Sequence, residues 1–244
     1  MKTKNRVYFL DILRGISVIA MIVHHSYVLL NFTRGVTFAF FTSPLFEVLQ
    51  MLFVSIFLLV SGICTNYSRS VAKRGALVFG AAMIVTLVTA VILPAFGIRG
   101  LEIYFGILHM FGLSMLLYAL IRPVMAKCNT ILGCVVCIVA FVLYNIWMYY
   151  VPFSKSDIWM VFGFPSPNFY SADYYPLLPY FFLFVAGTMI GRWVKNGKMP
   201  TWFYRVRMPI LEFVGRNSLF IYLLHQPVVL ALIFVVGGVI DWLI

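Results

Sequence analysis

The chain has 244 residues, of which 63% are hydrophobic and only 10% are charged. A soluble domain carries about 25% charged residues, so this composition excludes a soluble globular protein and indicates a protein that crosses a membrane several times. The net charge of +11 does not by itself indicate nucleic acid, because Lys and Arg also accumulate in the cytoplasmic loops of membrane proteins. We therefore expect membrane lipid as a partner and no nucleic acid.

Seven segments are apolar enough to cross the bilayer, which takes about 20 residues of helix. The connections between them contain Pro, Gly, Asn, Ser, Lys and Arg, which are typical of turns. The expected spans are 7–30, 45–64, 76–96, 103–121, 131–151, 176–194 and 219–240. The sequence thus predicts an all-α polytopic membrane helical bundle of about seven transmembrane helices, with one domain over residues 1–244.

The basic residues lie mostly on one side of this predicted topology. If the N-terminus is cytoplasmic, only Arg34, Arg99 and Lys155 lie on the outer side, and Arg14 lies within the first span. By the positive-inside rule, the N-terminus is expected in the cytoplasm and the C-terminus outside. The basic residues of the inner side are Lys2, Lys4, Arg6, Arg69, Lys73, Arg74, Arg122, Lys127, Arg192, Lys195, Lys198, Arg205, Arg207 and Arg216.

The first span carries four ionisable residues, Asp11, Arg14, His24 and His25. Such groups are costly in a bilayer and usually have a partner or a function. At 100° per residue, Arg14 lies about 20° and Asp11 about 40° from His25 around the helix, so these three form one stripe. Asp11 and His25 are about 21 Å apart along the axis, and the stripe therefore joins the inner end of the span to its outer half.

Other polar residues are expected at the outer side. Glu102 and His109 are seven residues apart, so on one helix they would share a face about 10 Å apart. Glu47 opens the second span and Asp173 the sixth, so carboxylates and His25 would gather in the outer half. A carboxylate that accepts a hydrogen bond from one imidazole nitrogen leaves the other available as a base. The outer loop 152–175 is long enough for an acceptor site or a lid.

Structural roles remain open for several of these residues. A buried His can serve only to hydrogen-bond a neighbouring helix, which is the favoured interpretation of His24 and, narrowly, of His225. Asp11 and Arg14 are spaced to neutralise each other. Cys134 and Cys137 form a C-x-x-C inside a span, where they are interpreted as packing residues. No spacing of His, Cys and carboxylates predicts a metal site.

Several segments resemble, in chain order, the small bacterial relatives of heparan-α-glucosaminide N-acetyltransferase, which belong to the transmembrane acyltransferases. The similarity covers nearly the whole chain and is carried by Arg6 to Gly15 (R-x-x-x-L-D-I-L-R-G) followed by His25, the segment 53–64 with Ser61-Gly62, Lys73-Arg74-Gly75, Phe105 to Gly112 (F-G-I-L-H-M-F-G), Asp173 to Pro179 (D-Y-Y-P-L-L-P), and Gly215 to Pro227 (G-R-N-S-L-x-x-Y-x-x-H-Q-P).

This resemblance implies transfer of an acetyl group from cytoplasmic acetyl-CoA to an amino group, or a hydroxyl group, of a sugar or glycan on the extracytoplasmic side of a bacterial inner membrane. The implied catalytic residues are His25 as general base, or less favourably as nucleophile, with His109, Asp173 and Glu102. The candidate donor-binding residues are Asp11, Arg14, Arg74, Arg216, Asn217 and His225, because the phosphates of acetyl-CoA need basic partners. No metal is expected, and the oligomeric state, including a homodimer, stays open.

A proton-coupled transporter for small solutes is the alternative function, since the same histidines and carboxylates can relay protons. Such a transporter is expected to show an inverted repeat and paired broken helices. Neither is evident in the seven spans, so the acetyltransferase interpretation is preferred.

Overall fold

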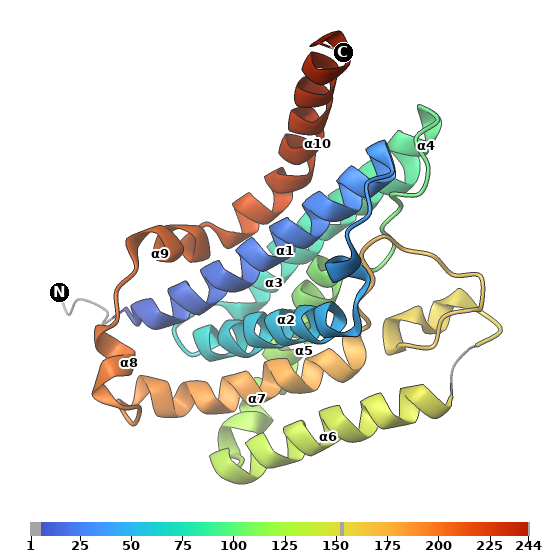
Figure 1. The fold of residues 1–244 in the computed structure, drawn as a ribbon. Helices are drawn as coiled ribbons and strands as arrows, with labels where there is room; N and C mark the ends of the chain where they lie inside the picture. The colour runs from blue at the N-terminus through green and yellow to red at the C-terminus, as the bar shows by residue number, and fades with distance from the viewer. Residues whose placement is uncertain (1–5, 152–153, 244) are drawn as a thin grey trace. The chain divides into compact units, whose positions relative to one another are not determined.

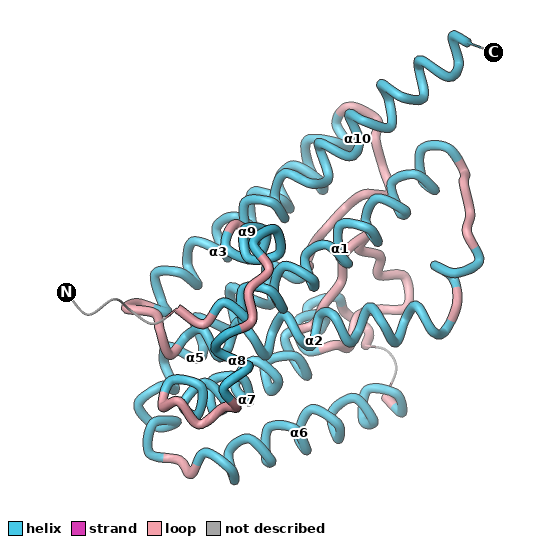
Figure 2. Tube along the Cα trace, turned by 60° about the vertical axis from the view of Figure 1, so that its left-hand side comes forward, coloured by secondary structure: helices cyan, strands magenta, loops and turns pink. Residues whose placement is uncertain are grey.

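The computed structural model of the protein describes residues 6–151 and 154–243 (Figure 1). Lys2 and Lys4, counted above among the inner basic residues, and Pro152 of the long outer loop lie outside this range. Helices joined by loops make up the described chain, which contains no β-strand (Figure 2). The elements are α1 (Tyr8–Arg34), η1 (Ala39–Thr42), α2 (Pro44–Thr65), α3 (Val71–Thr86), η2 (Leu87–Ile92), α4 (Leu93–Ala95), α5 (Ile107–Lys127), α6 (Thr130–Tyr150), η3 (Asp157–Phe162), α7 (Leu177–Lys195), α8 (Thr201–Arg205), α9 (Pro209–Arg216) and α10 (Ser218–Leu243).

Seven helices of the described chain are long and apolar enough to cross a membrane, which confirms the predicted all-helical class and the number of spans. The third span is continuous over Val71–Ala95 and includes the π-helical segment η2. Large apolar side chains are exposed along these helices, for example Leu120 at 76% and Leu143 at 60%. Such surfaces are stable in lipid rather than in water.

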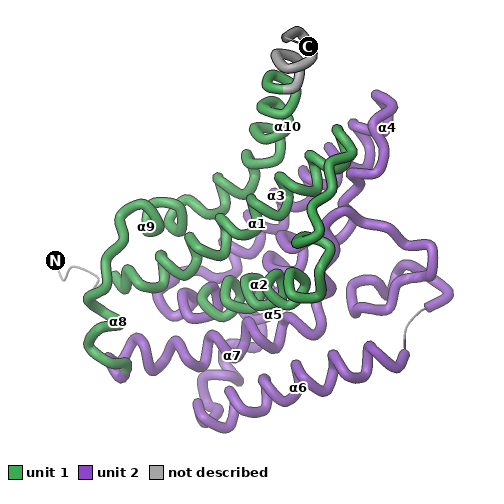
Figure 3. The backbone as a smooth tube through the Cα atoms, in the orientation of Figure 1, with its two compact units in different colours: residues 1–60, 199–244 green, residues 61–198 purple. Residues whose placement is uncertain are grey.

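The chain divides into two compact units, residues 1–60 with 199–244 and residues 61–198 (Figure 3). In unit 1, α1 packs against α8, α9 and α10. Gly15 of α1 lies against the backbone of Leu211, and Gly215 of α9 lies against the backbone of Asp11. Because neither glycine has a side chain, α1 and α9 approach each other to backbone contact, as small residues allow in membrane helices.

In unit 2, α3 packs against α5, α5 packs against α7, and α7 packs against α6. The loop before α5 pairs with the loop before α7, because the amides of Ala172 and Tyr175 donate to the carbonyls of Glu102 and Phe105 at 2.8 and 3.2 Å. These two loops hold the candidate residues Glu102 and Asp173.

The fourth span begins later than expected, at Ile107 instead of residue 103. The preceding residues are extended because both backbone groups of Ile103 bind threonines of the third span. The Ile103 amide donates to Thr89 Oγ1 at 3.1 Å, and its carbonyl accepts from Thr86 Oγ1 at 2.8 Å. The prediction that Glu102 and His109 share a helical face is therefore wrong, since Glu102 lies in a loop.

Candidate functional site

His25 and His225 form a buried pair in unit 1. Nδ1 of His25 on α1 lies 2.8 Å from Nε2 of His225 on α10, and the two rings are stacked with centroids 5.0 Å apart. The rings are only 8% and 6% exposed. The sequence predicts a carboxylate beside His25, whereas in unit 1 its partner is a histidine 200 positions away in the chain.

The hydrogen bonds of this pair fix the tautomer of each ring. Nδ1 of His225 lies at hydrogen-bond distance from the Tyr222 carbonyl, which can only accept, so Nδ1 must carry the hydrogen. In the neutral ring, Nε2 of His225 then accepts from Nδ1 of His25, and Nε2 of His25 holds a lone pair. The amide of Gln226 lies 3.4 Å from the same Nδ1, and its oxygen rather than its nitrogen suits that position.

Nε2 of His25 has no hydrogen-bond partner among the described residues. The neighbouring His24 differs, because its Nδ1 is fully buried and has no hydrogen-bond partner in the described chain. Nε2 of His25, by contrast, is not fully buried. His24 stacks on Phe46 with ring centroids 5.2 Å apart, and its ring centroid lies 5.6 Å from that of His25. An accessible imidazole lone pair backed by a second imidazole is suited to take up a proton.

Asp11 and Arg14 lie at the N-terminal end of α1, where it crosses α9. Asp11 accepts from Arg6 Nε at 2.7 Å, whereas Arg14 Nη1 is 3.7 Å from the other carboxylate oxygen. Arg14 also donates to the Gly215 carbonyl at 3.4 Å. Asp11, Arg14 and His25 all meet α9 or α10, as their helical spacing predicts. Because Arg6 makes the shorter contact with Asp11, Arg14 keeps donors for another anion.

Arg216 and Asn217 are exposed at the junction of α9 and α10. Arg216 Nε donates to the Glu212 carbonyl at 3.3 Å, and the Asn217 amide donates to the Phe213 carbonyl at 2.9 Å. Arg74 is also a candidate for donor binding. It belongs to unit 2 and is exposed in the first turn of α3.

Glu212 is a buried residue that the sequence does not single out as a candidate. Its carboxylate is 1% exposed and accepts from Arg207 Nε at 2.8 Å and Nη2 at 3.2 Å. The Arg207 guanidinium also lies over the ring of Tyr8, 3.6 Å from the centroid. The signal in the sequence was a lone acidic residue five positions after an arginine, at the start of a short amphipathic helix. This ion pair ties α9 to the start of α1.

His109 and Asp173 meet at the N-terminus of α5 in unit 2. The Gly106 amide donates to His109 Nδ1 at 3.2 Å, so Nε2 carries the hydrogen and donates to Thr86 Oγ1 at 3.0 Å. Asp173 Oδ2 accepts from the Ile107 amide at 3.1 Å. A carboxylate at a helix N-terminus satisfies a free amide and opposes the helix dipole. Both groups therefore hold the start of α5, and both ring nitrogens of His109 are occupied.

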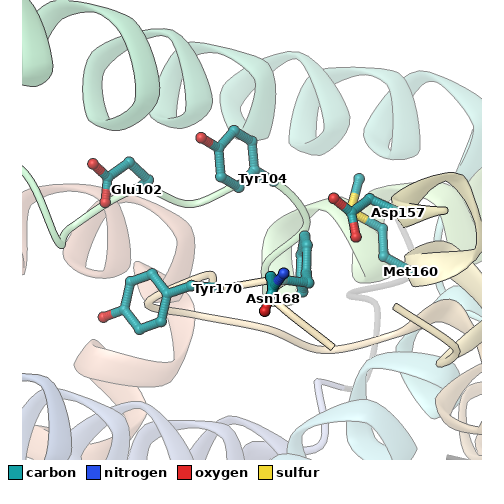
Figure 4. A pocket seen from close by; sticks show the side chains of 7 residues that line it. Glu102, Tyr104, Asp157, Met160, Asn168 and Tyr170 are labelled. Atoms are coloured by element: carbon teal, nitrogen blue, oxygen red, sulfur yellow. The ribbon is translucent and has the colours of Figure 1, made fainter. Parts of the chain in front are cut away.

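Glu102 lines a pocket of about 410 Å³ in the loops of unit 2 (Figure 4). Figure 4 shows Glu102 and Tyr104 on one side of this pocket, Tyr170 and Asn168 on the facing loop, and Asp157 with Met160 at one end. Phe169 completes the lining. Of these residues, only Glu102 was named as a candidate from the sequence, although the long loop was expected to hold an acceptor site.

The described residues contain no group of three or more His, Cys, Asp or Glu side chains that could hold a metal ion.

A protein-family model matches the chain over residues 6–227. Its description is "Heparan-alpha-glucosaminide N-acetyltransferase, catalytic". The chain belongs to this family. The resemblance found in the sequence is thereby confirmed. No curated protein and no solved structure matches the chain.

Membership in this family, called the N-acetyltransferase family below, indicates an integral membrane transferase. The seven apolar helices of the described chain agree with this. The matched range covers all of unit 2, most of unit 1 and all ten candidate residues. It ends two residues after His225, so the His25–His225 pair lies within the part of the chain that defines the N-acetyltransferase family.

Proposed function

We propose that this member of the N-acetyltransferase family transfers acetyl from cytoplasmic acetyl-CoA to an amino or hydroxyl group of a sugar or glycan on the extracytoplasmic side of a bacterial inner membrane. The family match supports acetyl transfer. The observation that carries the proposal is the hydrogen-bonded His25–His225 pair, because it leaves an accessible lone pair on Nε2 of His25.

The donor is proposed to bind at the inner end of unit 1. Arg14 and Arg216 offer guanidinium groups near the crossing of α1 and α9, where Asn217 adds an amide. Phosphate groups of acetyl-CoA suit arginine donors. Asp11 holds Arg6 and lies beside Arg14. The rise of the α1 helix separates Asp11 from His25 by about 21 Å, which suits a long, thin pantetheine arm.

In the proposed reaction, Nε2 of His25 takes the proton of the acceptor amine or hydroxyl as this group attacks the thioester carbonyl. The new C–N or C–O bond forms, the C–S bond breaks, and CoA leaves as a thiolate that receives the proton from His25. His225 stabilises the intermediate imidazolium, because its Nε2 accepts from the charged ring. The C=O of Tyr222 keeps His225 in the tautomer that can accept.

The remaining candidates stay predictions. Arg74 is proposed as a further phosphate contact, and Glu102, His109 and Asp173 as residues that support the chemistry. For His109 and Asp173 the contacts at the start of α5 favour positioning roles over direct proton transfer.

The test is acetyl-CoA binding by the purified protein, followed by acetyl transfer to a panel of amino sugars. His25→Ala is expected to abolish transfer, a loss of at least about 100-fold for a general base. His225→Ala is expected to lower kcat with little change in KM for acetyl-CoA. His24→Ala is the matched control, because it removes the adjacent imidazole and leaves the pair intact.

Near-normal transfer by purified His25→Ala would refute the assignment of the base. Absence of saturable acetyl-CoA binding in the unmodified protein would instead favour the transporter alternative. Incubation with acetyl-labelled acetyl-CoA without acceptor separates direct transfer, which leaves no label on the protein, from an acetyl-His25 intermediate.

A further inference from the structure

The pocket in the loops of unit 2 combines two carboxylates with three aromatic rings. Glu102 and Asp157 are two of only seven acidic residues in the whole chain. Tyr104, Tyr170 and Phe169 also line the pocket, and the two tyrosines are 45% and 57% exposed. Its volume of about 410 Å³ falls in the range of small-molecule sites, about 300–1,000 Å³.

Backbone amides hold both carboxylates in place. The Gly100 amide donates to Glu102 Oε2 at 2.7 Å, and the Ser166 amide donates to Asp157 Oδ1 at 3.0 Å. No Lys or Arg lines the pocket, and neither carboxylate forms an ion pair with a described residue. Asp11 and Glu212, by contrast, are neutralised by arginines. The pocket therefore keeps its negative charge and at least one free oxygen on each carboxylate.

The rings are suited to the same kind of ligand as the carboxylates. The face of a Tyr or Phe ring attracts a ligand cation through its quadrupole. Tyr170 is fixed at the rim because its hydroxyl donates to the Gly100 carbonyl at 2.9 Å. Asn168 adds an amide that can both donate and accept, which suits the hydroxyl groups of a ligand. Carboxylates, rings and amide together favour a small organic ammonium that also carries hydroxyl groups.

We propose that this pocket binds amino sugars through their free ammonium group and discriminates against the same sugars once they are N-acetylated. Glu102 and Asp157 lie on different sides of the pocket in Figure 4, so one can hold the ammonium and the other a hydroxyl of the ring. Acetylation converts the ammonium to a neutral amide and removes the charge attraction to its carboxylate and to the rings.

This selectivity gives the pocket a role in substrate capture and product release, a role that rests on the proposed function. The acceptor is held as its ammonium form, releases one proton to water to become the attacking amine, and leaves once acetylation has made its nitrogen a neutral amide. The binding preference itself does not depend on acetyl transfer, so the two can be tested separately.

The experiment measures binding of glucosamine, N-acetylglucosamine and glucose to the purified full chain in nanodiscs, without acetyl-CoA, by saturation-transfer NMR and calorimetry. Glucosamine is expected to bind at least about fivefold more tightly than the other two, and less tightly at high salt. Glu102→Gln and Asp157→Asn should each lower glucosamine affinity about threefold to fivefold. The double variant should bind the three sugars alike.

Glu47→Gln is the matched control, since it removes an exposed carboxylate of unit 1 that does not line the pocket. It should leave the preference unchanged. Size-exclusion profiles and unfolding midpoints confirm that each variant is folded. Equal affinities for the three sugars in the unmodified protein, no binding of any of them, or a preference that survives in the double variant would each overturn the proposal. Amine-selective binding in a protein that transfers no acetyl would uphold the pocket and refute the proposed function.

Discussion

Glu212 shows how a single buried carboxylate can hold a junction of helices together. Arg207 donates to both of its oxygens, and the Met208 amide donates to Oε1 at 3.0 Å. These bonds favour the ionised carboxylate. The hydrogen bond from Arg207 is the main reason that the pKa of Glu212 lies below its ordinary value. The same hydrogen bond raises the pKa of Arg207.

This lowered pKa predicts acid sensitivity of the protein. Because the folded-state pKa lies below the unfolded value of about 4.3, the stabilisation by Glu212 is complete above that pH. It is lost as the pH falls through the lower folded-state value. Unfolding midpoints measured between pH 7 and pH 3 should fall less in Glu212→Gln than in the unmodified protein, and Glu212→Gln should be less stable at pH 7. Parallel pH profiles for the two proteins would contradict this role.

The residues of the site show which contacts a sequence can predict. Helical spacing correctly placed Asp11, Arg14 and His25 on one face, because all three lie on one uninterrupted helix. The partner of His25 could not be predicted, because His225 is 200 positions away and no local pattern pairs them. Glu102 was misplaced for a related reason. Hydropathy continued through Ile103, whereas hydrogen bonds to Thr86 and Thr89 keep that residue extended.

At the level of elements, the crossing of α1 and α9 depends on two glycines. A Cβ atom on Gly15 would lie 2.3 Å from the Leu211 carbonyl oxygen, and one on Gly215 would lie 1.9 Å from that of Asp11. Both obstacles are backbone atoms, which cannot move aside as a flexible side chain does. The crossing also positions Arg14 against the Gly215 carbonyl, so its geometry affects the proposed donor site.

Gly15→Ala and Gly215→Ala are each expected to destabilise the protein by about 1–3 kcal/mol, because overpacking forces the helices apart. Both should also raise KM for acetyl-CoA if Arg14 contacts the donor. Thermal unfolding in detergent measures the first effect, and steady-state kinetics the second. Gly80→Ala is the control, since a Cβ at that helical position meets nothing within 4 Å. Equal stability of the three variants would show that the crossing tolerates a methyl group.

The helix bounds predicted from hydropathy agree closely with the structure for some spans. They agree less closely where polar contacts determine where a helix begins. The second, fifth and sixth spans agree with expectation to within one residue at each end. Neither the π-helical segment η2 nor the separation of α8 from α9 was predicted. For α8, the contacts lie far apart in the sequence, since Phe9 packs against Trp202 and Phe203 with ring centroids 5.3 and 5.0 Å apart.

On the scale of the whole molecule, the basic residues cluster at particular helix ends. In unit 2, Arg192 at the end of α7 donates to the carbonyls of Cys128 and Met125 at the end of α5. In unit 1, Arg14, Arg207 and Arg216 lie around α9. If the positive-inside rule holds, both groups face the cytoplasm, and the loop with the amino-sugar pocket faces the outside.

Cysteine labelling tests this orientation, and the chain already carries a suitable reporter. Cys128 is exposed in the short connection between α5 and α6, which is expected on the cytoplasmic side. A membrane-impermeant maleimide should label Cys128 in inverted vesicles but not in intact cells. Ser156→Cys, introduced into a Cys128→Ser background, should show the opposite pattern, because the exposed Ser156 lies in the loop expected outside. Cys128→Ser alone gives the background from Cys64, Cys134 and Cys137. Labelling of Cys128 in intact cells would reverse the topology and place the proposed donor site on the wrong side for cytoplasmic acetyl-CoA.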